Sequence, residues 1–417
     1  MSAPHCIVIG AGIVGSSCAW HLVQSGCAVT LVDRVEPGLS TSFGNAGCIS
    51  PSQLAPYSYP GVWKKIPGWL RDELGPLTIR WGHLPWIAPW LLRFLRSGTA
   101  AGVRRAAEAQ AQIMYRVPGD WDAILAASGQ SAMRTSNGLI VLFDTEEQFQ
   151  AAKWQYELDA ELGFEWRQLG RDELQQMAPA LQPAEQGVAL HIPSWQHLAD
   201  PSTVTAGIAS AAIAAGVQWR LASVQAVSAS ADGVSLSTSE SGRIEADALV
   251  VAAGPWSNLL ATQLDHAVPM TPKRGYHSML ASPNVRLEHP VMSASRSFVM
   301  TPMAAGLRLA GTAEFARLDA APNYRRAMIL QQHARRYLPG LNCAPSSEWM
   351  GQRPMMADSV PVISTSPKHR NVFYAFGHGH YGLTQGPSTG RIIAALVRGE
   401  DPGIDLAPYR FDRFRKQ

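Results

Sequence analysis

The chain has 417 residues, of which 46% are hydrophobic and 16% are charged, and this composition excludes an intrinsically disordered protein. The formal net charge of +3 is too small for a nucleic-acid-binding protein, so we expect no nucleic-acid partner. The length exceeds what one ordinary hydrophobic core accommodates, and we therefore expect two domains.

The cysteines argue against a disulfide framework and against a structural zinc site. There are five of them, an odd number, and none forms a CxxC pair. A reducing, cytoplasmic compartment fits this usage. The N-terminus lacks the pattern of a secretory signal peptide, and no apolar run reaches the length of a membrane span.

The first thirty-three residues have the pattern of a dinucleotide-binding βαβ unit. The apolar run CIVIG leads into GAGIVG and a helical stretch, and a second apolar run, AVTLVD, ends on an acid. Gly10 permits a tight turn, Gly12 lets a pyrophosphate approach the backbone, and Gly15 lets the helix pack closely on the strand. The helix N-terminus attracts phosphate, and Asp33 can accept hydrogen bonds from a ribose diol. The contacts predicted in this unit are Gly10, Gly12, Ile13, Val14, Gly15, Asp33 and Arg34.

The next stretch favours FAD over NAD as the dinucleotide. An NAD enzyme normally continues with further short βαβ units. Here a loop of small residues, Ser40–Ser52, follows instead, and such a loop lets the backbone approach a flat ring system closely.

Later segments read as further pieces of the same domain. Asp200-Pro201-Ser202 is typical of a helix N-terminus, and Asp232-Gly233 between two strand-like runs predicts a hairpin. ADALVVAAG and NVFYAFG predict buried strands, and PSTGRIIAALVRG predicts a helix that ends at Gly399. Between these pieces, GLIVLFD, TPKRGYHSML and RSFVMTPMAAGLRLAG read as strands of one antiparallel sheet.

We therefore predict an α/β fold, α+β overall, with two interleaved domains. A Rossmann-like FAD-binding domain comprises residues 1–55, 199–266 and 346–417. An antiparallel-sheet substrate domain comprises residues 56–198 and 267–345.

Four motifs, in this order along the chain, resemble those of a known family. They are TSFGNAG (Thr41–Gly47), EADALVVAAGPWS (Glu245–Ser257), GQRPMMADSVPVI (Gly351–Ile363) and FGHGHYGLTQGPSTGR (Phe376–Arg391). With the N-terminal glycine motif, they resemble the D-amino acid dehydrogenase branch of the FAD-dependent amine oxidoreductases, which also include D-amino acid oxidase, glycine oxidase and sarcosine oxidase. Within that branch the chain looks similar to the bacterial enzymes, the D-hydroxyproline dehydrogenase type among them.

The resemblance implies further contacts to a non-covalently bound FAD. Some relatives attach flavin through a cysteine, but Cys343 lies ten residues before Arg353 and does not match that pattern. Val224 is expected near the adenine. The other contacts that the resemblance implies are Thr41, Ser42, Asn45, Ala46, Gly47, Ala253, Gly254 and Trp256.

Arg353 is the first candidate for a substrate contact. An arginine meets a carboxylate with two parallel N–H bonds, which fixes its orientation, and the resemblance gives the Arg353-Pro354 motif this role. Gly351 and Pro354 suggest a turn here. Tyr276 is the second candidate, since its phenol can donate to a carboxylate, although a tyrosine buried within a strand is a common alternative.

The loop from Gly377 to Gly390 leads into the last helix. Its backbone N–H groups can bind the pyrimidine oxygens of a flavin, and the helix N-terminus adds positive potential there. The contacts predicted in this loop are Gly379, Tyr381, Gly382, Leu383 and Thr384. His378 and His380 lack the further ligands that a metal site needs, so we expect no metal.

The segment Trp81–Gly98 has three tryptophans, a run of leucines and two arginines, with Trp63, Lys64, Lys65 and Trp69 upstream. Such a segment is typical either of a helix packed on the substrate sheet or of a peripheral membrane contact. The resemblance supports the second, because D-amino acid dehydrogenases deliver electrons to the respiratory chain. The expected acceptor is a quinone or another electron carrier, and the expected location is the cytoplasm, at the inner face of the membrane if this contact forms.

The function expected is oxidative deamination of a D-amino acid, with hydride transfer from the alpha carbon to flavin. The product is an imino acid, which hydrolyses to a 2-oxo acid. The alternatives are a D-hydroxyproline or D-proline dehydrogenase, a glycine- or sarcosine-type amine oxidase and, in another class, a non-catalytic flavoprotein subunit.

Overall fold

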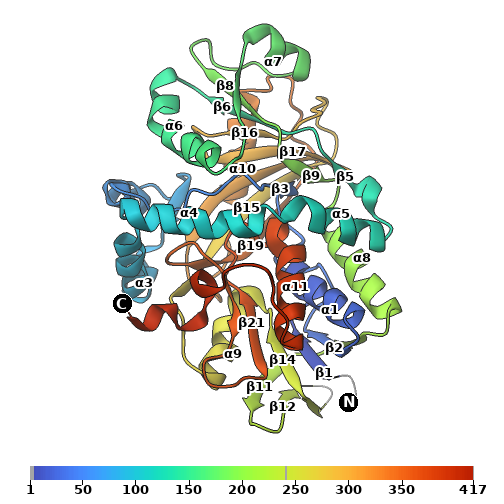
Figure 1. Cartoon of the computed structure of the whole chain (residues 1–417). Helices are drawn as coiled ribbons and strands as arrows, with labels where there is room; N and C mark the ends of the chain where they lie inside the picture. The colour runs from blue at the N-terminus through green and yellow to red at the C-terminus, as the bar shows by residue number, and fades with distance from the viewer. Residues whose placement is uncertain (1–3, 240–241, 417) are drawn as a thin grey trace.

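The computed structural model describes residues 4–239 and 242–416 and has two large sheets stacked along one axis (Figure 1). The lower one is a six-stranded sheet in the order β10-β2-β1-β14-β21-β20, parallel except for β20. Its strands come from three parts of the chain, as expected: β1 (His5–Ile9), β2 (Ala28–Asp33), β10 (Gln218–Leu221), β14 (Ala248–Val251), β20 (Val362–Thr365) and β21 (Val372–Phe376).

The helix α1 (Ile13–Gln24) follows β1 and completes the predicted βαβ unit. Gly10 has φ +110° in the turn, and a Cβ on Gly15 would lie 1.7 Å from the carbonyl oxygen of Gly10. Both glycines are therefore required for the strand, turn and helix to pack as they do.

Two more helices cover α1 and belong to later parts of the chain. The helix α8 (Pro201–Ala214) begins at Asp200, whose carboxylate accepts the backbone N–H of Ser202 at 2.9 Å, as the sequence predicted. The helix α11 (Gly382–Arg398) packs on α1 so closely that a Cβ on Gly390 would lie 2.6 Å from the backbone of Ser17. The cofactor fold is thus assembled from distant segments.

The predicted hairpin forms part of a small three-stranded sheet beside the six-stranded one. It comprises β11 (Val224–Ala229), β12 (Val234–Thr238) and β13 (Gly242–Ala246). The helix α9 (Ser257–Leu264) packs against β11, and its Gln263 side chain accepts the backbone N–H of Val227 at 2.9 Å.

The upper sheet has nine strands in the order β19-β15-β18-β17-β16-β6-β8-β7, with β4 pairing to β18. It is antiparallel except at the β16–β6 and β18–β4 pairs. Its strands are β4 (Leu77–Ile79), β6 (Leu139–Phe143), β7 (Arg167–Leu169), β8 (Val188–Ile192), β15 (Met270–Leu280), β16 (Val291–Ser293), β17 (Phe298–Met303), β18 (Gly306–Phe315) and β19 (Ser346–Met356). The helices next to it are α6 (Glu146–Glu161), α7 (Arg171–Met177) and α10 (Arg325–Arg335).

The structure corrects two of the predicted domain boundaries. Residues 346–356 form β19, which pairs with β15 along its whole length, so the last piece of the cofactor domain begins after Met356 and not at residue 346. For the same reason Arg353 lies within a strand and not in a turn. The long-range pairing overrides the local turn signal of Gly351 and Pro354.

The second correction concerns α4 (Ala100–Met114) and α5 (Val117–Ala127), which we placed in the substrate domain. Both helices pack on α11: the Trp121 indole donates to the carbonyl of Thr384 at 3.0 Å, and the Gln385 amide donates to Gln110 at 2.5 Å. The apolar side of α4 joins the core beneath the six-stranded sheet.

The remaining elements connect the two sheets or border them. The three short strands β3 (Cys48–Ile49), β5 (Arg134–Thr135) and β9 (Gln196–Leu198) form a sheet between the domains. The helices α2 (Ile66–Arg71) and α3 (Leu84–Ser97) lie at one side (Figure 1). Within the described part of the chain, no helix combines the length and the apolar character needed to cross a membrane.

Candidate active site

A cavity of about 1250 Å³ lies between the two large sheets. One end is lined by the turn after β1 and the ends of β2 and β14, and the other by β15, β19 and the loop before α11. A cleft at the carboxyl ends of parallel strands is the usual place for a dinucleotide in such folds.

The first end of the cavity has the features of a dinucleotide cradle. The Asp33 carboxylate at the end of β2 accepts the backbone N–H of Ala11 at 2.7 Å, and the Ser42 hydroxyl accepts that of Ile13 at 3.0 Å. These bonds tie β2 and the small-residue loop to the N-terminus of α1. Gly12 lines the cavity and has no side chain of its own, so a pyrophosphate can approach its backbone at the helix N-terminus. The residues present therefore fit the ADP part of FAD.

Most of the predicted cofactor contacts line this cavity. They are Gly10, Gly12, Ile13, Val14, Asp33, Arg34, Thr41, Ser42, Asn45, Ala46, Val224, Ala253, Gly254, Trp256, Gly379, Gly382 and Leu383. The Arg34 guanidinium also lies 4.1 Å above the Trp256 ring, which places both side chains at the same edge of the cavity.

Four predicted contacts lie behind the lining and support it. Gly15 packs α1 on β1, and the Gly47 carbonyl accepts the N–H of Leu198. The Thr384 hydroxyl accepts the N–H of Ser50 at 3.0 Å, and Tyr381 is buried in an apolar cluster. The structure therefore places these four residues outside the cavity lining, where they pack or form hydrogen bonds.

The small-residue loop is held from the upper sheet. The Arg308 guanidinium on β18 donates to the carbonyls of Phe43 and Asn45, at 3.2 and 2.6 Å. Nδ1 of His277 on β15 donates to the Gly44 carbonyl at 3.1 Å, and the ring stacks on Trp349 of β19 with ring centroids 5.3 Å apart. Gly44 is in turn required, because a Cβ there would lie 1.9 Å from the indole of Trp349.

Arg353 projects from β19 into the second end of the cavity. Its guanidinium lies over Gly275 of β15, where a Cβ would be 2.1 Å from the guanidinium carbon. No ion pair or hydrogen bond connects this guanidinium to another described residue. Burial lowers the pKa of Arg353, and the nearby Tyr57 phenol opposes that shift. An unpaired guanidinium beside a cofactor site can hold an anionic group of a substrate.

Lys273 is a cavity residue that the sequence analysis missed. It is the direct partner of Arg353 in the β15–β19 ladder, and it is only 3% exposed. Its ammonium lies 4.0 Å above the Tyr57 ring, and burial together with Arg353 holds the pKa of Lys273 well below its usual range. The alternation of side chains along a strand is the signal that could have indicated it. Lys273 and Gly275 are two residues apart and therefore lie on the same face of β15.

Tyr57 and His380 complete this end of the cavity; a histidine near the flavin or substrate was expected here, whereas Tyr57 was not predicted. The Tyr57 hydroxyl is hydrogen-bonded to Nδ1 of His380, while Nε2 of His380 is buried and has no partner among the described residues. His378 is bonded to the Thr389 hydroxyl at 2.9 Å. Burial, Lys273 and Arg353 lower the pKa of His380, so a neutral ring is favoured beside the two cations.

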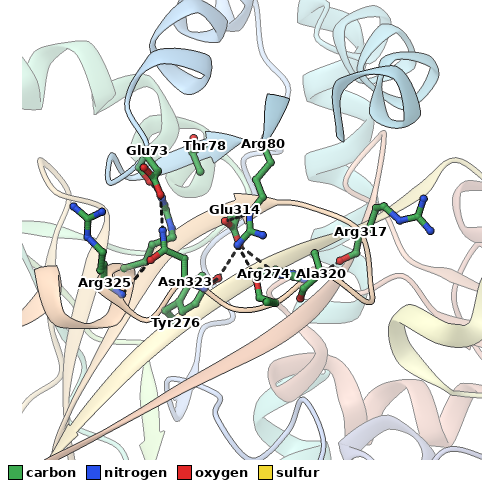
Figure 2. Close-up of polar contacts among 12 residues, drawn as sticks. Glu73, Thr78, Arg80, Arg274, Tyr276, Glu314, Arg317, Ala320, Asn323 and Arg325 are labelled. Atoms are coloured by element: carbon green, nitrogen blue, oxygen red, sulfur yellow. Dashed lines mark hydrogen bonds and ion pairs between the residues drawn. The ribbon is translucent and has the colours of Figure 1, made fainter. Parts of the chain in front are cut away.

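Tyr276 does not line the cavity, and the predicted contact to substrate is wrong. The side chain lies on the opposite face of β15, where its hydroxyl donates to Glu314 at 2.7 Å and accepts the N–H of Asn323 at 3.1 Å (Figure 2). Arg80 is paired with Glu314 at 2.6 Å and Arg274 lies 3.6 Å from it. Tyr276 thus belongs to a buried polar network behind the sheet.

Comparison with known proteins agrees with this geometry. A family model described as FAD dependent oxidoreductase matches residues 5–396. A protein named D-amino-acid oxidase from Bradyrhizobium diazoefficiens is 36% identical, and the alignment covers 98% of this chain and 99% of that protein. A D-amino acid dehydrogenase from Paramagnetospirillum magneticum is 33% identical, with 98% of each covered.

Solved structures show the same fold. Glycine oxidase from Geobacillus kaustophilus superposes with a TM-score of 0.76 at 21% identity, with 99% of each chain covered. L-proline dehydrogenase from P. horikoshii gives a TM-score of 0.75 at 18% identity, with 100% of this chain and 98% of that one covered. The predicted fold class and the predicted cofactor, FAD, are therefore confirmed. The chain belongs to the DAO family of FAD-dependent oxidoreductases.

Proposed function

We propose that the protein oxidises D-amino acids to imino acids, which hydrolyse to 2-oxo acids. The observation that carries the proposal is Arg353, whose guanidinium has no ion pair or hydrogen bond to a described residue and lies in the cavity that the predicted cofactor contacts line. The names of the two relatives, D-amino-acid oxidase and D-amino acid dehydrogenase, support this substrate class.

Bound FAD would supply the acceptor for the hydride that leaves the carbon bearing the amine. Arg353 binds the substrate carboxylate through two parallel N–H bonds and so fixes which way the alpha carbon faces. Gly275 leaves the space in which the guanidinium lies. Tyr57 and Trp349 line the cavity and exclude water from the carboxylate pair, which strengthens it.

Anaerobic flavin bleaching tests this proposal. The holoenzyme is mixed without oxygen with matched D- and L-amino acids, D- and L-proline, the hydroxyprolines, glycine and sarcosine. We expect the absorbance of oxidised flavin to disappear with D-amino acids and to persist with their L-enantiomers. Bleaching by glycine or sarcosine alone would assign the enzyme to another amine, and no bleaching by any amine would support a non-catalytic flavoprotein.

We also propose that the protein docks on an anionic membrane surface and passes electrons to a quinone-type acceptor. Trp63, Trp81 and Trp86 are 59%, 65% and 68% exposed, whereas Ile87 and Trp90 on the other side of α3 are buried. A surface with tryptophans and cations suits a lipid interface. We call it the tryptophan surface; its members are Trp63, Lys64, Trp81, Trp86, Leu92, Arg93 and Arg96.

The tryptophan surface adjoins residues that line the cavity, which supports an acceptor that arrives from the membrane. Val62 and Lys65, which flank Trp63 and Lys64, line the cavity, and so do Trp69 and Leu77. An acceptor dissolved in the lipid would therefore meet the cavity at the same side of the molecule.

A further inference from the structure

We propose that Lys273 forms a second anion-binding site beside Arg353, and that the preferred substrates are D-amino acids with a carboxylate in the side chain. The inference rests on the proposed function, because it takes Arg353 as the group that holds the alpha-carboxylate. Lys273 would then hold the second carboxylate of the same molecule.

The two cations are neighbours by strand pairing. Lys273 and Arg353 are opposite each other in the antiparallel β15–β19 ladder, and both line the cavity. Side chains in such a pair start about 5 Å apart at Cβ, so one small molecule can reach both. The missing side chain at Gly275 leaves the guanidinium free to lie along the sheet.

The substrate end of the cavity has cations and no acid among its described lining residues. Four cationic side chains line the cavity: Arg34, Lys65, Lys273 and Arg353. Asp33 is the sole carboxylate among the described lining residues, and it lies at the dinucleotide end, bonded to the N–H of Ala11. One alpha-carboxylate would neutralise Arg353 alone.

Lys273 also lacks a partner within the protein. Its ammonium has no ion pair or hydrogen bond to a described residue; the Tyr57 ring is its nearest favourable contact, at 4.0 Å. A buried, unpaired lysine costs several kcal/mol in its charged form. The low pKa of Lys273 reflects this cost, and a bound carboxylate would offset it. The groups that face the ammonium are Arg353, Tyr57 and His380, and none is an acid.

Substrate pairs that differ only in charge test the inference. The value of kcat/KM is measured for D-glutamate against D-glutamine and for D-aspartate against D-asparagine. We expect the acid of at least one pair to be preferred about tenfold or more, since a charged hydrogen bond contributes about 1.5–3 kcal/mol. In Lys273→Met this preference should fall at least tenfold. The control variant Lys368→Met alters an exposed lysine near β21 and should retain the preference for acids over amides.

A binding measurement separates this inference from the proposed function. Glutarate and butyrate are titrated into the holoenzyme, and the change in the visible absorption of FAD is followed without turnover. We expect glutarate to bind about tenfold more tightly than butyrate in the wild type and equally in Lys273→Met. FAD content and melting temperature establish that the variant is folded.

Two results would overturn the inference. In the first, neutral D-amino acids bleach the flavin but neither the acid substrates nor glutarate are preferred; the proposed function then stands without the second site. In the second, Lys273→Met lowers kcat/KM equally for the acid and the amide substrates and shifts the pH dependence of kcat/KM. Lys273 would then act on the amine proton of the substrate. If no D-amino acid bleaches the flavin but glutarate binding depends on Lys273, the anion site stands and the proposed function fails.

Discussion

The guanidinium of Arg353 occupies the space above Gly275 that any other residue would fill with its side chain. A Cβ on Gly275 would lie 2.1 Å from the guanidinium carbon and from both terminal nitrogens. These residues belong to adjacent strands, β19 and β15, and are diagonal neighbours in the ladder. The position of the proposed carboxylate-binding group is therefore set from two strands at once.

Gly275→Ala should displace Arg353 and weaken substrate binding. We expect KM for a D-amino acid to rise about tenfold or more, because one good charge-assisted bond is worth about 1.5–3 kcal/mol. Steady-state kinetics and FAD content measure this. Gly119→Ala is the matched control, since nothing lies within 4 Å of a Cβ at that position. An unchanged KM in Gly275→Ala would show that the guanidinium does not bind substrate in this place.

Arg353→Ala should raise KM by about 100-fold or more while FAD content stays unchanged, because two hydrogen bonds to the carboxylate are lost. Arg353→Lys should recover part of this affinity, as a point charge without the bidentate geometry. The measurement is kcat and KM together with the ratio of flavin to protein. Loss of FAD from either variant would identify a structural arginine instead.

Tyr276→Phe should lower stability and leave KM unchanged. The variant removes the hydroxyl that bonds Glu314 and Asn323 behind the sheet, at a cost of about 1–3 kcal/mol. Urea unfolding and steady-state kinetics separate the two effects. Glu314→Gln should destabilise more, because it leaves buried Arg274 without its acid; Glu245→Gln, in an exposed ion pair with Arg243, is the control. A raised KM in Tyr276→Phe would restore the role first predicted for this side chain.

Acidification should destabilise the protein through His277. Burial next to Arg308 lowers the pKa of His277 to about 4, from 6.5. Because the folded state disfavours the proton, the stability is fully present above about pH 6.5 and is lost as the pH falls toward 4.

Between pH 7 and pH 5 this histidine should cost about 2 kcal/mol. Urea unfolding of wild type and His277→Gln at both pH values measures the difference, and His369→Gln is the control. The variant should lose less stability on acidification than the wild type. Equal losses would mean that the pKa of His277 is the same in the folded and the unfolded state, so that its protonation does not affect stability.

The tryptophan surface should bind vesicles that contain anionic lipid. We expect co-sedimentation with such vesicles, weaker binding to neutral ones and release by salt, since each cation near the surface contributes about 1 kcal/mol. Replacement of Trp63, Trp81 and Trp86 by serine should reduce binding on the order of tenfold or more. The control replaces Leu221 and Met328, which are also exposed, by serine. Equal binding by both variants would refute this docking surface.

The sequence predicted the elements whose signals are local. The βαβ unit, the hairpin at Asp232-Gly233 and the cap at Asp200 each depend on a few adjacent residues with fixed backbone needs. The glycine turn also carries a local signal, and most of the residues predicted to contact FAD line the cavity.

Features that depend on long-range pairing were predicted less well. A strand shows which residues share a face but not which face meets the cavity, so Tyr276 was chosen and Lys273 was missed. The position of α4 and α5 against α11 follows from contacts such as Trp121 to Thr384, which no local pattern reveals. The strand β19 had a turn-like sequence and became regular only through its pairing with β15.

The order of strands in the six-stranded sheet has a consequence for how the enzyme is made. The first strand, β1, lies next to β14, and β14 lies next to β21, which is synthesised after both. Until β21 and α11 arrive, the edge of β14 and the face of α1 around Ser17 have no cover. The six-stranded sheet is therefore complete only once β21 has been made, and we expect the whole cofactor cradle to form after that point.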